Sequence, residues 1–259
     1  MWPVIFEFGP IKLYSFGLMA ALAFLFGSRL LRLEMERRGY PEGTYSSYAI
    51  AALLGGFIGA RLNYLVTHLE EFQADPRGAM FSGAGLVWYG GLVGGIVATW
   101  LLSRKHKRSF LELGDVFAPS LAGVYLLGRV GCFVSGDGDY GYATDVPWAM
   151  AFPNGIVPTM ERVHPTPVYE VLMTLPILIL LWRTRLRDWP VGKQFGLYLI
   201  LTGLERFVVE FWRTNQRDVM GLTVAQVFGI GAILLGGLLF ARRGAAGGGM
   251  KDTDHTSTQ

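Results

Sequence analysis

Residues 219–241 read VMGLTVAQVFGIGAILLGGLLFA, a stretch of 23 residues without a charged side chain. A helix needs about 20 mostly apolar residues to cross the roughly 30 Å hydrocarbon core of a bilayer. This stretch therefore predicts a membrane-spanning helix. The uncharged run GAMFSGAGLVWYGGLVGGIVATWLLS at 78–103 predicts a second one, and shorter apolar runs at 13–28 and 44–60 predict two more.

Three further apolar stretches are interrupted by ionisable residues. Residues 116–133 contain Arg129, residues 167–182 contain Glu170, and residues 195–212 contain Glu205, Arg206 and Glu210. These stretches are 18, 16 and 18 residues long and mostly apolar, close to the length that a membrane-spanning helix needs. The sequence thus predicts an all-α polytopic membrane protein with seven transmembrane helices.

The composition agrees with a membrane protein. Only 17% of the 259 residues are charged, against about 25% in an average soluble domain, and 51% are hydrophobic. These values exclude a disordered chain and most ordinary soluble enzymes. The single cysteine, Cys132, rules out an internal disulfide, and a net charge of +3 is too small to indicate a nucleic-acid binder.

The distribution of lysine and arginine predicts the orientation. Segments 29–43, 103–111, 183–194 and the tail after residue 241 together hold 15 of these residues, whereas the alternate segments hold 5. Cytoplasmic loops carry the excess of positive charge. We therefore expect the N-terminus outside and the C-terminus in the cytoplasm, without a cleavable signal peptide.

One linker is too long to be a simple connection. Residues 134–166 are polar and rich in Gly, Pro, Asp and Trp, which predicts a small extracytoplasmic cap. With this cap, residues 1–243 form the predicted seven-helix domain. The glycine-rich tail at 244–259 is expected to be flexible.

Glycines recur four residues apart in two of the predicted spans. Such spacing lets helix backbones approach closely in a membrane. We interpret it as helix packing rather than chemistry. The pairs are Gly55/Gly59, Gly90/Gly94 and Gly91/Gly95.

Three charged residues of the sixth predicted span share one face. In the stretch RFVVEFWR, Arg206, Glu210 and Arg213 stand at i, i+4 and i+7, the spacing of one helical stripe. A charge at the centre of a membrane helix costs about 2.5 to 3.5 kcal/mol, so it needs a partner, water or a function. One interpretation is an internal ion-pair ladder. The other is that two cations around one carboxylate leave positive charge for an anionic ligand.

Arg129 lies near the outer end of the fourth predicted span, within GRVGCFVSGDGDYG. Gly131 permits close backbone approach, and Gly136 and Gly138 predict a tight turn beyond the membrane. An arginine in this setting can bind a phosphate bidentately. The alternative is that its long side chain reaches to the headgroup layer without a specific ligand.

Further ionisable residues allow two interpretations each. Glu170, in HPTPVYE, is either a structural counter-ion for Arg206 or Arg129 or a member of their site. His164, in the same motif, either caps the helix entry or acts as a base. Arg61 either contacts a phosphate as well or extends to the headgroups. Arginines near the outer membrane boundary, in an apolar bundle, favour an anionic lipid headgroup, although a channel or carrier for a soluble anion stays possible.

Four motifs resemble those of one family. GRVGCFVSGDGDYG resembles the signature G-R-x-G-N-F-x-N-G-E of the bacterial prolipoprotein diacylglyceryl transferases. HPTPVYE is similar to the family's H-P-S/T-Q-x-Y-E, RFVVEFWR to R-F-x-x-E-x-x-R, and WYGGLVGG to H-G-G-L-x-G. The motifs stand in the family's order, and the resemblance covers most of the chain.

The resemblance implies an activity in the bacterial inner membrane. The family transfers the diacylglyceryl group of phosphatidylglycerol to the lipobox cysteine thiol in the signal peptide of a prolipoprotein, with release of glycerol phosphate. A thiol with a pKa near ~8.5 must lose its proton to attack carbon, and the leaving phosphate needs stabilised charge. No metal or soluble cofactor is expected.

The resemblance also implies roles for individual residues. Arg129 is expected to bind the lipid headgroup and Arg206 the phosphate near the reacting carbon. The candidate catalytic residues are Arg129, Arg206, Glu210 and Tyr89, and the candidate substrate-binding residues are Arg129, Arg206, Arg213, Glu170, Asp137, His164 and Arg61. Within these sets, Glu170, Glu210 and Arg213 are expected to orient the arginines.

Several positions depart from the family motifs. Tyr89 stands in place of the usual histidine, Cys132 and Ser135 replace asparagines, and Asp137 replaces a glutamate. Without that histidine, the identity of the general base stays open. These departures also leave a rival hypothesis, a non-catalytic phospholipid or anion binder or a lipid transporter on the same helix bundle.

Overall fold

The computed structural model describes residues 1–9, 11–76 and 88–242. The chain divides into two compact units, one made of Met1–Gly27 with the chain from Gly114 onward and the other of Ser28–Leu113. The predicted tail at 244–259 and the first part of the predicted span at 78–103 lie outside the described residues.

Long helices dominate the described residues of both units. Seven helices have 17 or more residues each, and they coincide in position with the seven predicted spans. They are α1 (Ser15–Arg37), α2 (Thr44–Thr67), α5 (Trp88–Lys105), α6 (Phe110–Ser135), α7 (Thr166–Thr184), α8 (Lys193–Val209) and α9 (Val224–Ala241), and a short helix, α3 (Leu69–Ala74), follows α2.

Within the described part of the chain, five of these helices are long and apolar enough to cross a membrane, namely α1, α2, α6, α7 and α9. The described part of α5 begins only at Trp88, and α8 has 17 residues that include Lys193, Glu205 and Arg206. The chain is therefore a polytopic, mainly helical membrane protein. A total of seven spans stays a prediction.

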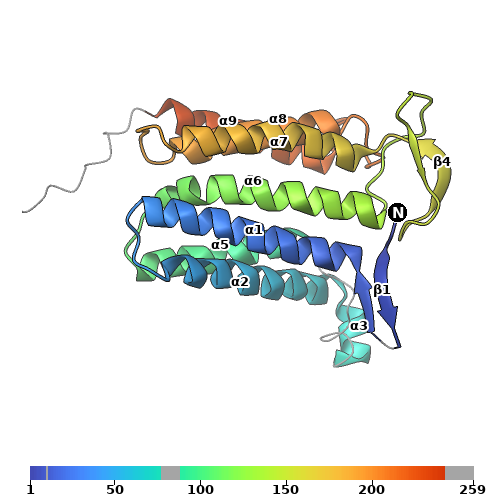
Figure 1. Cartoon of the computed structure of the whole chain (residues 1–259), viewed down its shortest axis with the longest axis horizontal. Coiled ribbons are helices and arrows are strands. Elements are labelled where there is room, and N and C mark those ends of the chain that lie inside the picture. The colour runs from blue at the N-terminus through green and yellow to red at the C-terminus, as the bar shows by residue number, and fades with distance from the viewer. Residues whose placement is uncertain (10, 77–87, 243–259) are drawn as a thin grey trace, which may run out of the picture. The chain divides into compact units, whose positions relative to one another are not determined.

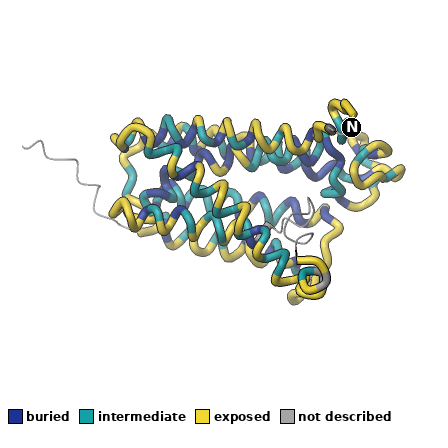
Figure 2. Tube along the Cα trace, turned by 90° about the horizontal axis from the view of Figure 1, so that it is seen from below, coloured by how far each residue is buried: buried dark blue, intermediate teal, exposed yellow. Residues whose placement is uncertain are grey.

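Exposed positions recur along the lengths of the helices in Figure 2, and many of these residues are large and apolar. On α9, for example, Leu234 and Leu238 are 63% and 67% exposed. Such faces are unfavourable in water but are solvated by lipid chains. The exposure pattern thus agrees with a membrane environment.

In the first unit, α7, α8 and α9 lie side by side (Figure 1). The contact between α8 and α9 is made by glycines: a Cβ added to Gly236 would lie 2.6 Å from the carbonyl oxygen of Gly196. At the start of α9, the Thr223 side chain accepts from the Gln226 N–H, and the Gln226 side chain accepts from the Thr223 N–H. This capping box explains why α9 begins where the sequence TVAQ stands.

A buried carboxylate fixes the start of α8. Asp115, on α6, accepts hydrogen bonds from the backbone N–H groups of Gly192 and Phe195, both at 2.7 Å. A negative charge at a helix N-terminus is stabilised by unpaired N–H groups and the helix dipole. Asp115 therefore links α6 to α8, the two helices that carry Arg129 and Arg206.

Two short hairpins correct the prediction of a purely α-helical chain. The first pairs β1 (Val4–Phe8) with β2 (Ile11–Tyr14), so residues 13 and 14, expected inside the first span, belong to a strand. Glu7 stands opposite Lys12 in this hairpin, and their side chains form an ion pair of 2.8 Å. Opposite charges on facing positions favour strand pairing, a cross-strand signal that helix periodicity does not detect.

The second hairpin lies in the linker between α6 and α7. It pairs β3 (Met150–Phe152) with β4 (Thr159–Val163) and packs on Tyr140, whose ring stacks on Phe152 at 4.1 Å. The Tyr142 N–H donates to the carbonyl of Trp212 at 2.9 Å. This linker thus holds the chain that follows α8 in place.

In the second unit, α2 packs against α5 through the predicted glycine pairs. A Cβ added to Gly59 would lie 2.8 Å from the Cα of Gly94. No side chain larger than hydrogen fits such a contact without movement. The interpretation of these glycines as packing residues is therefore confirmed for α2 and α5.

Candidate functional site

Glu170 is the centre of an ionic cluster in the first unit. Its side chain is 0% exposed, and it lies on the first turns of α7. Oε1 accepts from Arg206 Nη1 at 3.0 Å, Arg213 Nη1 at 3.4 Å and Tyr125 Oη at 3.0 Å, while Oε2 lies 3.2 Å from Arg129 Nε. One buried carboxylate therefore joins cations from α6, α8 and the segment after α8.

Asp139 forms a second bridge between two of these arginines. Oδ2 accepts from Arg129 Nη1, and Oδ1 accepts from Arg213 Nη2. Burial acts to raise the pKa of the Asp139 carboxyl, but the charges and hydrogen bonds of Arg213 and Arg129 lower it below the usual value. With 34% of its side chain exposed, Asp139 is the most accessible carboxylate of the cluster.

Glu210 contacts the guanidinium nitrogens of Arg206 and Arg213 that do not face Glu170 or Asp139. Its Oε2 lies 3.1 Å from Arg206 Nη2 and 3.8 Å from Arg213 Nε, and its Oε1 accepts from Asn215 Nδ2 at 2.5 Å. The predicted helical stripe is wrong at its end, because α8 stops at Val209. Arg213 reaches the cluster from a turn, held by a bridge to Gly141, rather than from a helix face.

Cations and anions balance in this cluster, which we call the arginine–carboxylate network. It comprises Arg129, Arg206, Arg213, Glu170, Glu210 and Asp139. The expectation of surplus positive charge counted two arginines against one carboxylate and is wrong for the network as a whole, since three guanidinium groups face three carboxylates. An incoming anion therefore has to displace one of these carboxylates from its arginines.

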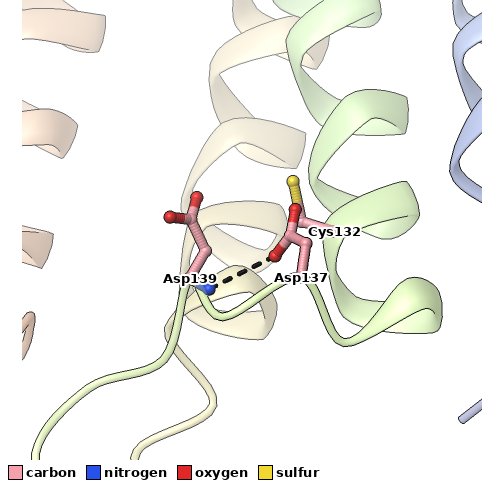
Figure 3. A group of neighbouring side chains, drawn as sticks. All are labelled: Cys132, Asp137 and Asp139. Carbon is pink, nitrogen blue, oxygen red and sulfur yellow. Dashed lines mark hydrogen bonds between the residues drawn. The ribbon is translucent and has the colours of Figure 1, made fainter. Parts of the chain in front are cut away.

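The glycine-rich turn after α6 places Asp139 beside Arg129. Gly136 and Gly138 have φ of 63° and 95°, the left-handed region that glycine tolerates. The Asp139 N–H donates to Asp137 Oδ1 at 3.2 Å, as Figure 3 shows. The predicted tight turn is confirmed, and Asp137 stabilises it.

Asp137 also lies near two other potential metal ligands. Ligand atoms of Cys132, Asp137 and Asp139 lie within 4.8 Å of one another (Figure 3). Both oxygens of Asp139, however, face arginines, and Arg129 Nη1 donates to Cys132 Sγ at 3.7 Å. Positive neighbours repel a bound cation, so the trio is better explained as part of the turn that faces Arg129 and Arg213.

His164 takes part in a different set of contacts. Its Nδ1 lies 2.9 Å from the hydroxyl of Tyr169, which also accepts from Trp148 Nε1 at 2.7 Å. The ring of Trp212 packs at 6.4 Å from that of His164. The described contacts of the His164 ring are thus with aromatic residues, not with the arginines of the network.

Two predicted site residues belong to the second unit. Arg61, on α2, lies over the ring of Tyr64, 5.2 Å from its centroid. Tyr89 belongs to the first turn of α5, and its side chain lies outside the described residues.

Sequence reasoning missed two contributors to the network. Asp139 lies within GRVGCFVSGDGDYG but two positions after Asp137, where the family signature ends, and nothing in its spacing marked it. Tyr125 stands four residues before Arg129 on α6, and its ring lies 5.0 Å from that guanidinium. The i, i+4 spacing on one helix was a usable signal for Tyr125.

The fold and the network define a polytopic helical membrane protein with partly buried arginines gathered around carboxylates. Residues 3–242 match the family model described as prolipoprotein diacylglyceryl transferase. The chain belongs to this transferase family, and the resemblance seen in its motifs is confirmed.

Named relatives agree with this family. The chain is 33% identical to the phosphatidylglycerol–prolipoprotein diacylglyceryl transferase of Clostridium tetani, over 93% of this chain and 97% of that protein. It is 34% identical to the proteins of the same name from Pasteurella multocida, over 90% and 86%, and from Idiomarina loihiensis, over 93% and 92%. The chain therefore spans nearly the full length of bacterial transferases.

Proposed function

We propose that this chain transfers the diacylglyceryl group of phosphatidylglycerol to the lipobox cysteine thiol in the signal peptide of a prolipoprotein. The thiol sulfur forms a bond to the glyceryl carbon, the bond between that carbon and the phosphate oxygen breaks, and glycerol phosphate leaves. Membership of the family and the shared name of its relatives support this reaction.

The observation that carries the proposal is the arginine–carboxylate network. Arg206 and Arg129 are 26% and 16% exposed at their side chains, whereas Glu170 and Glu210 are 0% exposed. The two arginine side chains thus stay partly accessible, while the glutamates that pair with them are buried. Fixed cations aimed at developing charge are among the strongest catalytic devices in a water-poor site.

The residue roles are those that the family motifs imply, and the contacts within the network support them. Arg129 binds the headgroup and Arg206 the phosphate beside the reacting carbon, while Glu170, Glu210 and Arg213 orient them. Because Asp139 is the most accessible carboxylate of the network, the lipid headgroup takes its place on Arg129. Asp137 acts through the turn, and the contributions of His164, Arg61 and Tyr89 are proposed from the family motifs.

The proposal includes a topology. Seven helices span the bacterial inner membrane as the domain 1–243, with the N-terminus outside and the C-terminus in the cytoplasm. Residues 134–166, with the β3–β4 hairpin, form the cap on the outer side. This side is where the positive-inside count leaves few basic residues and where a translocated lipobox cysteine becomes available.

A depletion strain tests the function. This chain is expressed in bacteria from which the native transferase has been depleted, and a reporter lipoprotein is analysed by mass spectrometry. We expect thioether-linked diacylglyceryl on the reporter cysteine. A reporter that stays unmodified, although the chain is inserted in the membrane, contradicts the transferase reaction and favours a lipid-binding protein.

A further inference from the structure

One nitrogen of the His164 ring is open to a ligand. Nδ1 lies 2.9 Å from the Tyr169 hydroxyl, but Nε2 has no hydrogen-bond partner among the described residues. Nor is Nε2 one of the fully buried polar atoms that lack a partner in this part of the chain. Since the residue is only half-buried, Nε2 faces accessible space rather than the protein interior.

The backbone of His164 is paired with the chain that carries the arginine–carboxylate network. Its carbonyl accepts from the Gly141 N–H at 2.9 Å, and a Cβ added to Gly141 would lie 2.7 Å from the His164 Cβ. Gly141 in turn forms a bridge with Arg213 and stands two residues after Asp139. His164 is therefore separated from two members of the network by a single backbone pairing.

Three aromatic side chains hold the imidazole in place. The rings of Tyr169 and Trp212 lie 5.9 Å and 6.4 Å from it, and they contact each other at 5.6 Å. The Tyr169 hydroxyl is also bound by Trp148 Nε1 at 2.7 Å. The described hydrogen bond of the imidazole is with this hydroxyl and not with a backbone N–H of α7, so the ring does not cap that helix.

The hydrogen bonds of this aromatic group run in one direction. The indole N–H of Trp148 can only donate, so the Tyr169 oxygen accepts from it. The phenol has one proton of its own, and His164 Nδ1 lies in position to accept it. A neutral imidazole carries a proton on one nitrogen only. An accepting Nδ1 therefore leaves that proton on Nε2, the accessible nitrogen.

We propose that His164 donates its Nε2–H to an oxygen atom of the phosphatidylglycerol headgroup, and that Tyr169 and Trp148 are positioning residues that fix this tautomer. The inference rests on the proposed function, which assigns the neighbouring network to the headgroup. A protonated Nε2 cannot take up the proton of the lipobox thiol. His164 is thus a substrate-binding residue and not the base of the reaction.

A neutral donor suits this position. Three guanidinium groups already face three carboxylates in the network, so a further cation would disturb the balance of charge. An imidazole N–H adds a directional hydrogen bond to a headgroup oxygen without adding charge. It therefore contributes to the orientation of the lipid rather than to its electrostatic attraction.

Nitrogen NMR tests the tautomer without any reaction. The full-length chain carries the heavy nitrogen isotope in its four histidines and is placed in phosphatidylcholine nanodiscs at about pH 8, where a free imidazole is neutral. The signals that disappear in His164→Gln belong to His164. We expect a protonated Nε2 in the wild type and in the control Tyr142→Phe, an exposed tyrosine of the same linker, but a mixture of tautomers in Tyr169→Phe. A wild-type His164 with its proton on Nδ1 overturns the proposal.

Added lipid tests the contact with the headgroup. The same nanodiscs are prepared with phosphatidylglycerol and without a peptide substrate, so that no transfer takes place. We expect the Nε2 signal of His164 to shift with phosphatidylglycerol and to stay unchanged when only the amount of phosphatidylcholine is raised. An Nε2 signal that is the same in both lipids overturns the proposed contact.

Amide variants separate three roles of His164 in the transfer assay. The amide of glutamine reaches the position of Nε2, and the shorter asparagine places its amide near that of Nδ1. Donation to the headgroup predicts a KM for phosphatidylglycerol within about threefold of wild type for His164→Gln and about tenfold higher for His164→Asn, with little change of kcat.

The other two roles give different results. A base predicts a large loss of kcat in both variants, and a purely structural contact with Tyr169 predicts that only His164→Gln is impaired. Either result overturns the proposal. An inactive wild type whose Nε2 signal still shifts with phosphatidylglycerol contradicts the proposed function instead and leaves the hydrogen bond to the headgroup supported.

Discussion

Arg213 contacts Glu170 across 43 positions of the sequence, with Nη1 3.4 Å from Oε1. Glu170 enters from the start of α7, and Arg213 comes from the turn after α8. Their contact closes the network on the side where the chain leaves α8. The Glu170 side chain is 0% exposed and the Arg213 side chain 7% exposed, so water competes little for either charge.

Removing the charge of Glu170 should destabilise the protein. Glu170→Gln leaves three arginines facing a neutral amide, and breaking a buried ion pair costs about 3 to 5 kcal/mol. Thermal unfolding in detergent should show a clearly lower Tm than for Glu161→Gln, a control at an exposed position of β4. Equal Tm values in the two variants would mean that Glu170 is not the centre of the network.

Lysine should not replace the network arginines. Arg129 uses Nε for Glu170 and Nη1 for Asp139, and Arg206 uses Nη1 for Glu170 and Nη2 for Glu210. A lysine ammonium cannot make both contacts with the same planar geometry. We expect Arg129→Lys and Arg206→Lys each to lower kcat/KM about a hundredfold or more, and the alanine variants to be inactive although inserted. Arg217→Lys, at an exposed position, serves as the control; full activity of either network variant would exclude bidentate binding.

Lowering the pH should reduce the stability of the folded protein, partly through protonation of Asp139. Because the pKa of Asp139 is lowered in the folded state, its ionised form contributes stability above the unfolded pKa of about 3.9. That contribution is lost as the pH falls through the lower, folded pKa. When the Tm is measured from pH 6 into the acid range, it should therefore fall less steeply below about pH 4 for Asp139→Asn than for the wild type. Parallel curves would show that Asp139 does not titrate with folding.

Two neighbouring glycines of α9 should respond differently to alanine. At Gly236 a Cβ would lie 2.6 Å from the Gly196 carbonyl oxygen, whereas at Gly237 nothing lies within 4 Å. Gly236→Ala should cost about 1 to 3 kcal/mol through overpacking, and Gly237→Ala should be neutral or slightly stabilising because alanine favours helix. The free energies of unfolding of the two variants are compared by titration with a denaturing detergent. A similar loss in both would refute the close packing of α8 on α9.

Variants at Tyr89 test whether the side chain at this position, usually a histidine in the family, takes part in the reaction. If the Tyr89 hydroxyl makes a catalytic hydrogen bond, Tyr89→Phe should lower kcat about tenfold, and Tyr89→His, the usual family residue, should retain activity. The assay is diacylglyceryl transfer to a lipobox peptide. A fully active Tyr89→Phe would show that the phenol has no essential chemical role.

Apolar runs predicted the positions of the long helices well, because a helix that crosses a membrane needs apolar side chains along its whole length. The same reasoning missed β1 and β2, whose few pairings depend on local contacts such as Glu7 with Lys12. Charged residues inside apolar runs pointed to Arg129, Glu170 and Arg206, since the membrane makes an unpaired charge expensive. Asp139 lies outside any apolar run, so no such cost marked it.

Transfer by the purified chain tests the central claim most directly. The wild type and Arg206→Ala are incubated in vesicles of phosphatidylglycerol with a peptide that carries a lipobox cysteine, and peptide mass and released glycerol phosphate are measured. The wild type should add one diacylglyceryl group to each modified cysteine and release an equal amount of glycerol phosphate, while Arg206→Ala should do neither. An unmodified peptide with the wild type, or equal transfer by Arg206→Ala, would contradict a transferase that acts through the arginine–carboxylate network.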